Sequence, residues 1–111
     1  MSDSDNLKKI LDQAQDAFDQ GDWEESTDLF TQAYAMEQTF DINKGLAASL
    51  LNQKRPGDAE AVILDYFNYY LSEPDTARMA LDIILENNDF LLANQLLNFY
   101  DTNPIPNIKQ D

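Results

Sequence analysis

The 111-residue chain contains no cysteine and no histidine. Without cysteine it can form no disulfide and offers no thiolate as a nucleophile or metal ligand. Without histidine it lacks the commonest general base and the commonest zinc ligand. Because these two absences remove the usual residues of hydrolytic and zinc chemistry, we expect no enzymatic activity, no cofactor and no metal site.

Glycine and basic residues are scarce. The three glycines are too few and too dispersed for a loop that cradles phosphate. Seven Lys and Arg residues stand against 21 Asp and Glu residues, which gives a formal net charge of −14. Because phosphate contacts need clustered Lys and Arg, we expect no binding to nucleic acid or to an anionic membrane. The charge favours a neutral or basic partner, or it serves only to keep the protein soluble.

The acidic residues do not follow a known metal-binding order. Asp12, Asp16 and Asp19 share one helical face, but the residues around Gly21 lack the alternation of an EF-hand loop. Carboxylate sites for two metals in helical bundles use Glu-x-x-His, which a chain without histidine cannot supply. We therefore interpret these carboxylates as a solvated surface that also caps helices.

Long apolar runs are absent as well. No stretch approaches the roughly 18 apolar residues that a membrane-spanning helix needs. Residues 1–5 are acidic and polar, unlike a secretory signal. Together with the lack of cysteine, this composition leads us to expect a cytoplasmic protein.

What the chain does contain is apolar residues at three- and four-residue steps, which is typical of amphipathic helices. This periodicity predicts an all-α fold, with six helices near residues 6–20, 23–37, 42–53, 59–71, 75–87 and 90–100. We expect a single helical domain over residues 6–100. Residues 1–5 should form a flexible tail, and residues 101–111 an extended tail because two prolines interrupt them.

Capping residues separate these patterns. Gly21 favours the left-handed conformation that ends a helix, and Asp22 can cap the next helix with Glu25 in a capping box. Thr39 or Asp41 should cap the third helix, and Asp58 the fourth. The fourth helix is apolar almost all round, so we expect its tyrosines to pack in the core in preference to forming a ligand platform.

The helix–turn–helix pattern repeats three times. The residues from Asp22 to Asp58 and from Asp58 to Asp89 span 36 and 31 positions, and those from Ala14 to Ala48 span 34. A helical hairpin in each period of about 34 residues resembles the tetratricopeptide repeat family. The resemblance covers roughly residues 6–104.

The first repeat carries the motif best, through Ala14, Gly21, Asp22, Trp23, Ser26, Phe30 and Ala33. The third repeat follows it through Asn88, Asp89, Phe90, Ala93, Leu97 and Pro104. In the second repeat the turn holds about two extra residues. The resemblance implies a right-handed array of three hairpins, with Trp23 packed between the first two helices.

The family binds peptides or partner helices in a concave groove lined by the first helix of each hairpin. Matching those positions gives these candidate groove residues: Lys8, Leu11, Gln15, Phe18, Asp19, Gly45, Ser49, Asn52, Gln53, Arg78, Asp82, Leu85 and Glu86. The resemblance therefore implies a non-enzymatic scaffold for a neutral or basic peptide.

An alternative follows from the last helix, which has no charged residue between positions 90 and 100. Terminal repeats need a polar outer face because no neighbour covers them. We therefore also consider a self-associating structural domain, or the N-terminal part of a longer repeat protein, without a peptide ligand. Leu92 and Leu96 are the candidate residues for a homodimer contact through this last hairpin.

Overall fold

The computed structural model describes the backbone of residues 3–102 and the side chains of residues 4–98. Helices joined by short turns make up this part of the chain, and it contains no strand, which confirms the all-α prediction. The helices are α1 (Asp3–Asp19), α2 (Trp23–Met36), α3 (Phe40–Asn52), α4 (Pro56–Leu64), α5 (Phe67–Tyr70), α6 (Pro74–Glu86) and α7 (Phe90–Thr102). The expected extended tail is described only at residues 101 and 102, which belong to α7; the remainder lies outside the described residues.

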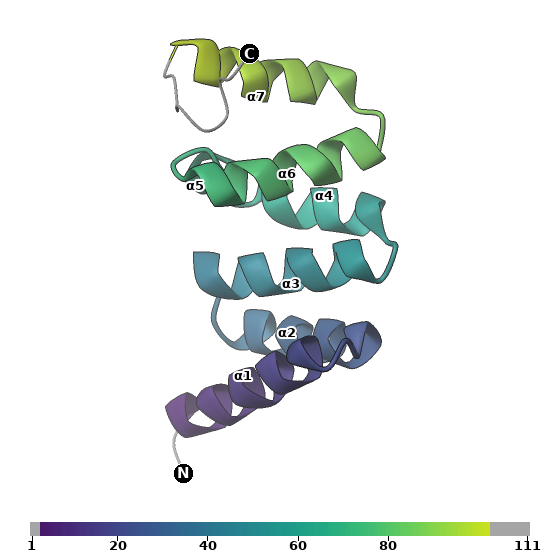
Figure 1. The fold of residues 1–111 in the computed structure, drawn as a ribbon. Helices are drawn as coiled ribbons and strands as arrows, with labels where there is room; N and C mark the ends of the chain where they lie inside the picture. The colour runs from purple at the N-terminus through teal and green to yellow at the C-terminus, as the bar shows by residue number, and fades with distance from the viewer. Residues whose placement is uncertain (1–2, 103–111) are drawn as a thin grey trace.

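The helices form an elongated stack that measures 50 × 25 × 21 Å (Figure 1). Each long helix packs chiefly on its neighbour in the sequence and runs in the opposite direction, with α1 at one end and α7 at the other. The short α5 is the exception, because α6 packs directly on α4. The stack therefore extends mainly in one direction, and each of its two end helices has a side that no other helix of residues 3–102 covers.

Three turns join α1 to α2, α3 to α4 and α6 to α7 in the same way. Gly21, Lys54 and Asn88 have positive φ angles of 77°, 66° and 57°. The N–H of the following residue then donates to a carbonyl five residues back, at 2.9 Å, 2.9 Å and 3.1 Å. This is the Schellman ending of a helix. The three residues are 33 and 34 positions apart, so the turns follow a regular period.

This regularity corrects the expected register of the second turn. The residue equivalent to Asp22 is Arg55, and the turn holds no extra residues. Helix α4 begins at Pro56, so Asp58 lies inside its first turn and does not cap it; its carboxylate accepts a hydrogen bond from Arg55 Nε at 2.9 Å. Proline is well suited to the first helical position, so α4 begins at Pro56 and not near residue 59 as expected.

The other expected caps form. Asp22 Oδ1 accepts from the N–H of Glu25 at 3.4 Å, and Thr39 Oγ1 accepts from the N–H of Ile42 at 3.2 Å. The N–H of Asp22 donates to the carbonyl of Ala17, so it does not complete a capping box with Glu25. At the N-terminus, α1 begins at Asp3, which makes the expected tail of residues 1–5 too long. Acidic residues in a first turn are stabilised by the helix dipole.

The expected helix over residues 59–71 is wrong, because the chain breaks at Asp65 and Tyr66 between α4 and α5. The cause is a buried hydrogen-bond network around Asn43, whose side chain has no exposed surface. Asn43 Nδ2 donates to the carbonyl of Val62 at 2.8 Å and to Tyr34 Oη at 3.1 Å. Tyr70 Oη donates to Asn43 Oδ1. Burial raises the pKa of Tyr70 above its usual value, so the hydroxyl remains a donor.

The tyrosines of this region pack mainly as core residues. Tyr70 is buried, and its ring meets that of Phe40 edge-on at 5.0 Å. Tyr66 is half-buried and donates to the carbonyl of Gln38 at 3.0 Å, while Tyr69 is largely exposed. Small residues allow close helix contact elsewhere in the core, and these have no exposed surface: Ala14, Ser26, Ala33, Ala47, Ala59, Ala77 and Ala80.

Trp23 is less buried than expected. The residue is only partly buried, and its ring meets that of Phe18 edge-on at 5.0 Å. We expect Trp23→Ala to lower the free energy of unfolding by about 1–3 kcal/mol, below the roughly 3–5 kcal/mol of a fully buried aromatic ring. Urea denaturation followed by circular dichroism measures the loss. Trp23→Phe is the control and should retain most of the stability, whereas an equal loss in both variants would contradict this packing.

Candidate protein interface

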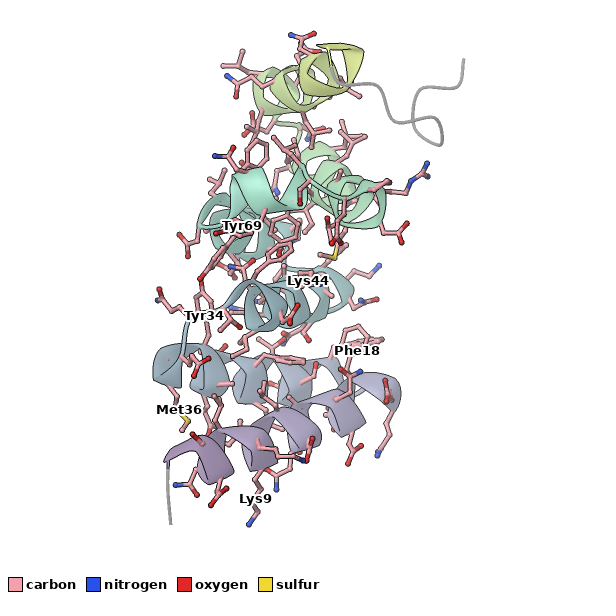
Figure 2. All side chains as sticks on the ribbon, turned by 90° about the vertical axis from the view of Figure 1, so that its left-hand side faces the viewer. Lys9, Phe18, Tyr34, Met36, Lys44 and Tyr69 are labelled. Carbon is pink, nitrogen blue, oxygen red and sulfur yellow. The ribbon has the colours of Figure 1, made fainter. Side chains whose placement is uncertain are left out.

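Three depressions lie along the side of the stack that α1, α3 and α6 form, and the expected groove residues line parts of each. Figure 2 shows Phe18 on this side, whereas Tyr34 and Met36 lie toward the other side.

The first depression, of about 290 Å³, lies between α1 and α3. Gln15 and Phe18 come from α1, and Phe30 of α2 reaches the same cavity. Lys44 of α3 stands at this depression and forms an ion pair with Asp41 at 3.2 Å. The depression thus combines two aromatic rings with a cation that is already paired, which suits an apolar side chain.

Gly45 lines the first depression at a point where the structure has no room for a side chain. A Cβ at this position would lie 2.6 Å from the ring of Phe30, so α2 and α3 can approach only because the side chain is absent. We expect Gly45→Ala to destabilise the protein by about 1–2 kcal/mol, since overpacking outweighs the gain in helix propensity.

Gly57→Ala is the matched control for this prediction. A Cβ there would meet only Asn87 Oδ1, at an ordinary 3.7 Å, so the propensity gain should raise stability by up to about 1 kcal/mol. Chemical denaturation of both variants measures the difference. Stabilisation by both substitutions would show that Phe30 moves aside easily.

The second depression is the largest of the three, at about 690 Å³, and lies between the C-terminal ends of α3 and α6. Leu51 and Leu85 provide apolar surface, and Asp82 and Glu86 provide two carboxylates. Lys54 is the cation at this site, and among the described residues no ion pair joins it to either carboxylate. The local excess of negative charge suits a ligand that carries a cation beside an apolar group.

The third depression, of about 200 Å³, lies between α6 and α7. Arg78 and Asp82 are its exposed charged residues, and Leu81, Leu96 and Leu97 supply its apolar surface. Asp82 also lines the second depression, so the two are adjacent.

Two of the expected groove residues do not reach this face. Ser49 is fully buried, where it accepts a hydrogen bond from Ser26 Oγ at 2.8 Å. Gln53 caps the end of α3, and its Oε1 is shielded from solvent without a hydrogen-bond partner among the described residues. The burial of Ser49 contradicts its assignment, because α3 has helices packed on two opposite sides and retains only a narrow exposed strip. Gln53 is partly exposed but lines none of the three depressions.

Three further candidates stand apart from the depressions. Leu11 is half-buried and packs against the core. Lys8 is exposed and pairs with Asp12 at 3.0 Å, and exposed Asp19 accepts from Gln15 Nε2 at 2.9 Å. The structure therefore brings these candidates into the depressions: Gln15, Phe18, Gly45, Asn52, Arg78, Asp82, Leu85 and Glu86.

Sequence reasoning missed several residues that line the face, among them Lys44 and Lys54. Lys54 could have been found from the spacing of helix ends, because it lies 33 residues after Gly21 at the same point of the turn. No spacing in the sequence predicts the place of Lys44, because the first depression forms only where α1, α2 and α3 pack together.

The expected dimer ridge was assigned to the wrong side of α7. Leu96 is only 1% exposed and Leu92 packs against the core, because both turn toward α6. The exposed apolar residues of α7 are Phe90, Leu91 and Leu97. The error is one of helical register, which residue type alone does not reveal in a helix where leucine recurs on several sides.

A separate depression of about 570 Å³ lies between α4 and the turn before α7. Glu60 and Asp89 both line it, and burial together with Asp89 raises the pKa of Glu60. A raised pKa means that the folded state binds the proton more tightly, so the ionised form opposes folding.

We therefore expect Glu60→Gln to raise the melting temperature slightly at neutral pH. The gain should disappear as the pH falls below the unfolded-state pKa of about 4.3, where Glu60 is protonated in both states. Thermal melts of the two proteins across this pH range measure the effect. A gain that does not change with pH would mean that the charge of Glu60 is not its cause.

Within residues 3–102, no helix is both long and apolar enough to cross a membrane. The same residues contain no cluster of three or more side chains suited to holding a metal ion. Comparison with known proteins gives no match: no family model fits the chain, and no curated protein or solved structure matches it significantly.

Proposed function

We propose that this chain is a non-enzymatic protein-interaction scaffold that binds an extended peptide or partner helix along the face of α1, α3 and α6. The observation that carries the proposal is the row of three depressions on that face. Each is lined by both apolar and charged side chains. A peptide in such a site is recognised by pockets for its side chains.

The proposed ligand is neutral to basic. Three carboxylates and three cations line the depressions: Asp41, Asp82 and Glu86, and Lys44, Lys54 and Arg78. The depressions themselves are therefore balanced in charge, but the whole chain has a net charge of −14 and sets the field around them. Such a field attracts cationic ligands and repels acidic ones. An apolar residue of the ligand would enter the first depression, and a basic residue the second.

We further infer that the chain is a member of the tetratricopeptide repeat class, with the right-handed arrangement of hairpins that the resemblance implies. The turns at 33- and 34-residue spacing and the buried small residues Ala14, Ser26 and Ala33 support this assignment. A cytoplasmic location is part of the same proposal, because a chain without cysteine depends on no oxidising compartment.

Two synthetic peptide pools test the function. One pool contains leucine and phenylalanine with lysine and arginine, and the other replaces the basic residues by aspartate and glutamate; neither contains tryptophan. Trp23 is the only tryptophan of the chain and contacts Phe18 at the first depression, so its fluorescence reports binding. We expect the basic pool alone to change the emission, and added salt to weaken the effect.

Charge-reversal variants identify the face. The double variant Asp82→Lys/Glu86→Lys should lose binding by about tenfold or more, as expected for removing charge partners at a binding site. The control Asp28→Lys/Glu37→Lys makes the same change in net charge at exposed residues that line none of the three depressions. Equal losses in the two variants, or equal binding of the two pools, would overturn the proposal.

A further inference from the structure

The outer face of α7 differs from every other exposed surface of the stack. Phe90, Leu91 and Leu97 are 61%, 73% and 42% exposed. The other exposed residues of this helix segment are the amides Asn94, Gln95 and Asn98. We refer to these six residues as the α7 face. It contains no ionisable side chain, whereas every other helix longer than four residues has at least one exposed charge.

We propose that the α7 face is a self-association site at which two copies of this chain pair about a twofold axis. Exposed apolar surface at the end of a helical stack needs cover, and no helix of the described chain lies beyond α7 (Figure 1). The proposal does not rest on the peptide-binding function, although Leu97 at the edge of the α7 face also lines the third depression.

Charge decides which partner suits this face. Two proteins with a net charge of −14 each repel one another, and contact is easiest where neither presents a carboxylate. The α7 face is such a surface. Asp89 precedes α7 and lies beyond the first residue of this face, so it would stand at the rim of a contact centred on Asn94.

Charge also excludes head-to-tail stacking of copies. The opposite end of the stack is α1, whose exposed residues include Lys8, Lys9, Asp12 and Asp16. Figure 2 shows Lys9 pointing away from the stack at that end. Packing α1 against the α7 face would remove these charges from water, and only Lys8 and Asp12 are paired with each other, so the burial is unfavourable. Pairing two α7 faces buries none, and it closes as a dimer.

The amides complete the contact. Around a twofold axis near Asn94, the side chain of Asn94 faces its own copy, and those of Gln95 and Asn98 lie in the same contact. An amide both donates and accepts, so it can pair with an identical group. Six residues a side are far fewer than the roughly 20–30 of a standard interface, and we therefore expect a weak dimer.

Sedimentation equilibrium of the full chain tests the proposal between about 1 μM and about 1 mM, the range in which a small interface dissociates. We expect a monomer–dimer equilibrium that shifts toward the dimer with added sodium chloride, because salt screens the repulsion of two acidic molecules. This salt dependence is opposite to that expected for peptide binding. A monomer throughout the range, or growth beyond the dimer, would overturn the proposal.

Leu91→Glu should abolish the dimer, while Gln32→Glu makes the same charge change on exposed α2 and should leave it intact. Because the chain has no cysteine, single substitutions also allow cross-linking at defined positions. Under mild oxidation Asn94→Cys should give a covalent dimer much faster than Gln32→Cys. Equal rates of cross-linking, or a dimer that survives Leu91→Glu, would place the contact elsewhere and overturn the proposal.

Discussion

Replacing Asn43 with alanine should lower the free energy of unfolding by about 3–4 kcal/mol. The substitution leaves the buried hydroxyl of Tyr70 without its acceptor and removes the amide that bonds the carbonyl of Val62. Each unsatisfied buried group opposes folding by about 1–3 kcal/mol, and the lost side-chain volume adds to this. Urea denaturation followed by far-ultraviolet circular dichroism measures the change.

Tyr70→Phe tests whether the hydrogen bond carries this effect. Removal of the Tyr70 hydroxyl leaves Asn43 Oδ1 unpaired, with an expected loss of about 1–3 kcal/mol. In the double variant with Asn43→Ala the two losses should not add, because each substitution removes the same bond. Additive losses would show that the two side chains stabilise the fold separately and that the network around Asn43 has been assigned too much importance.

Leu96→Glu should detach α7 from the stack. Leu96 is 1% exposed, and an unpaired carboxylate buried there would oppose folding by more than about 4 kcal/mol. Because α7 packs only at the end of the stack, local unfolding lets the carboxylate reach water while the remaining helices persist. Amide hydrogen exchange should show lost protection in α7 and retained protection in α1, α2 and α3.

Leu91→Glu is the matched control, since it places the same residue on the same helix at a position that is 73% exposed. At concentrations where the chain is a monomer, its stability should change by no more than about 0.5 kcal/mol. If Leu91→Glu exposed α7 and Leu96→Glu did not, the helix would be rotated relative to the register described above.

The sequence alone determined the all-α class and most helix ends. Alternation of apolar residues at three- and four-residue steps is a local property, because any helix with such a stripe must bury it. Asp22 and Thr39 cap their helices as expected, since a capping bond joins residues only three positions apart. Gly21 ends α1 for the same local reason.

The tertiary structure alone decided the break between α4 and α5, the burial of Ser49 and the orientation of α7. The break depends on Asn43, which lies 19 residues before Val62 and 27 before Tyr70. The residues next to the break in the sequence therefore do not predict it. Ser49 is buried by Ser26 of another helix. In α7 leucine recurs on several sides, and only contact with α6 selects Leu96 as the buried residue and leaves Leu91 in solvent. Side chains far apart in the chain settle these features, because the helices bury whichever surfaces fit together best.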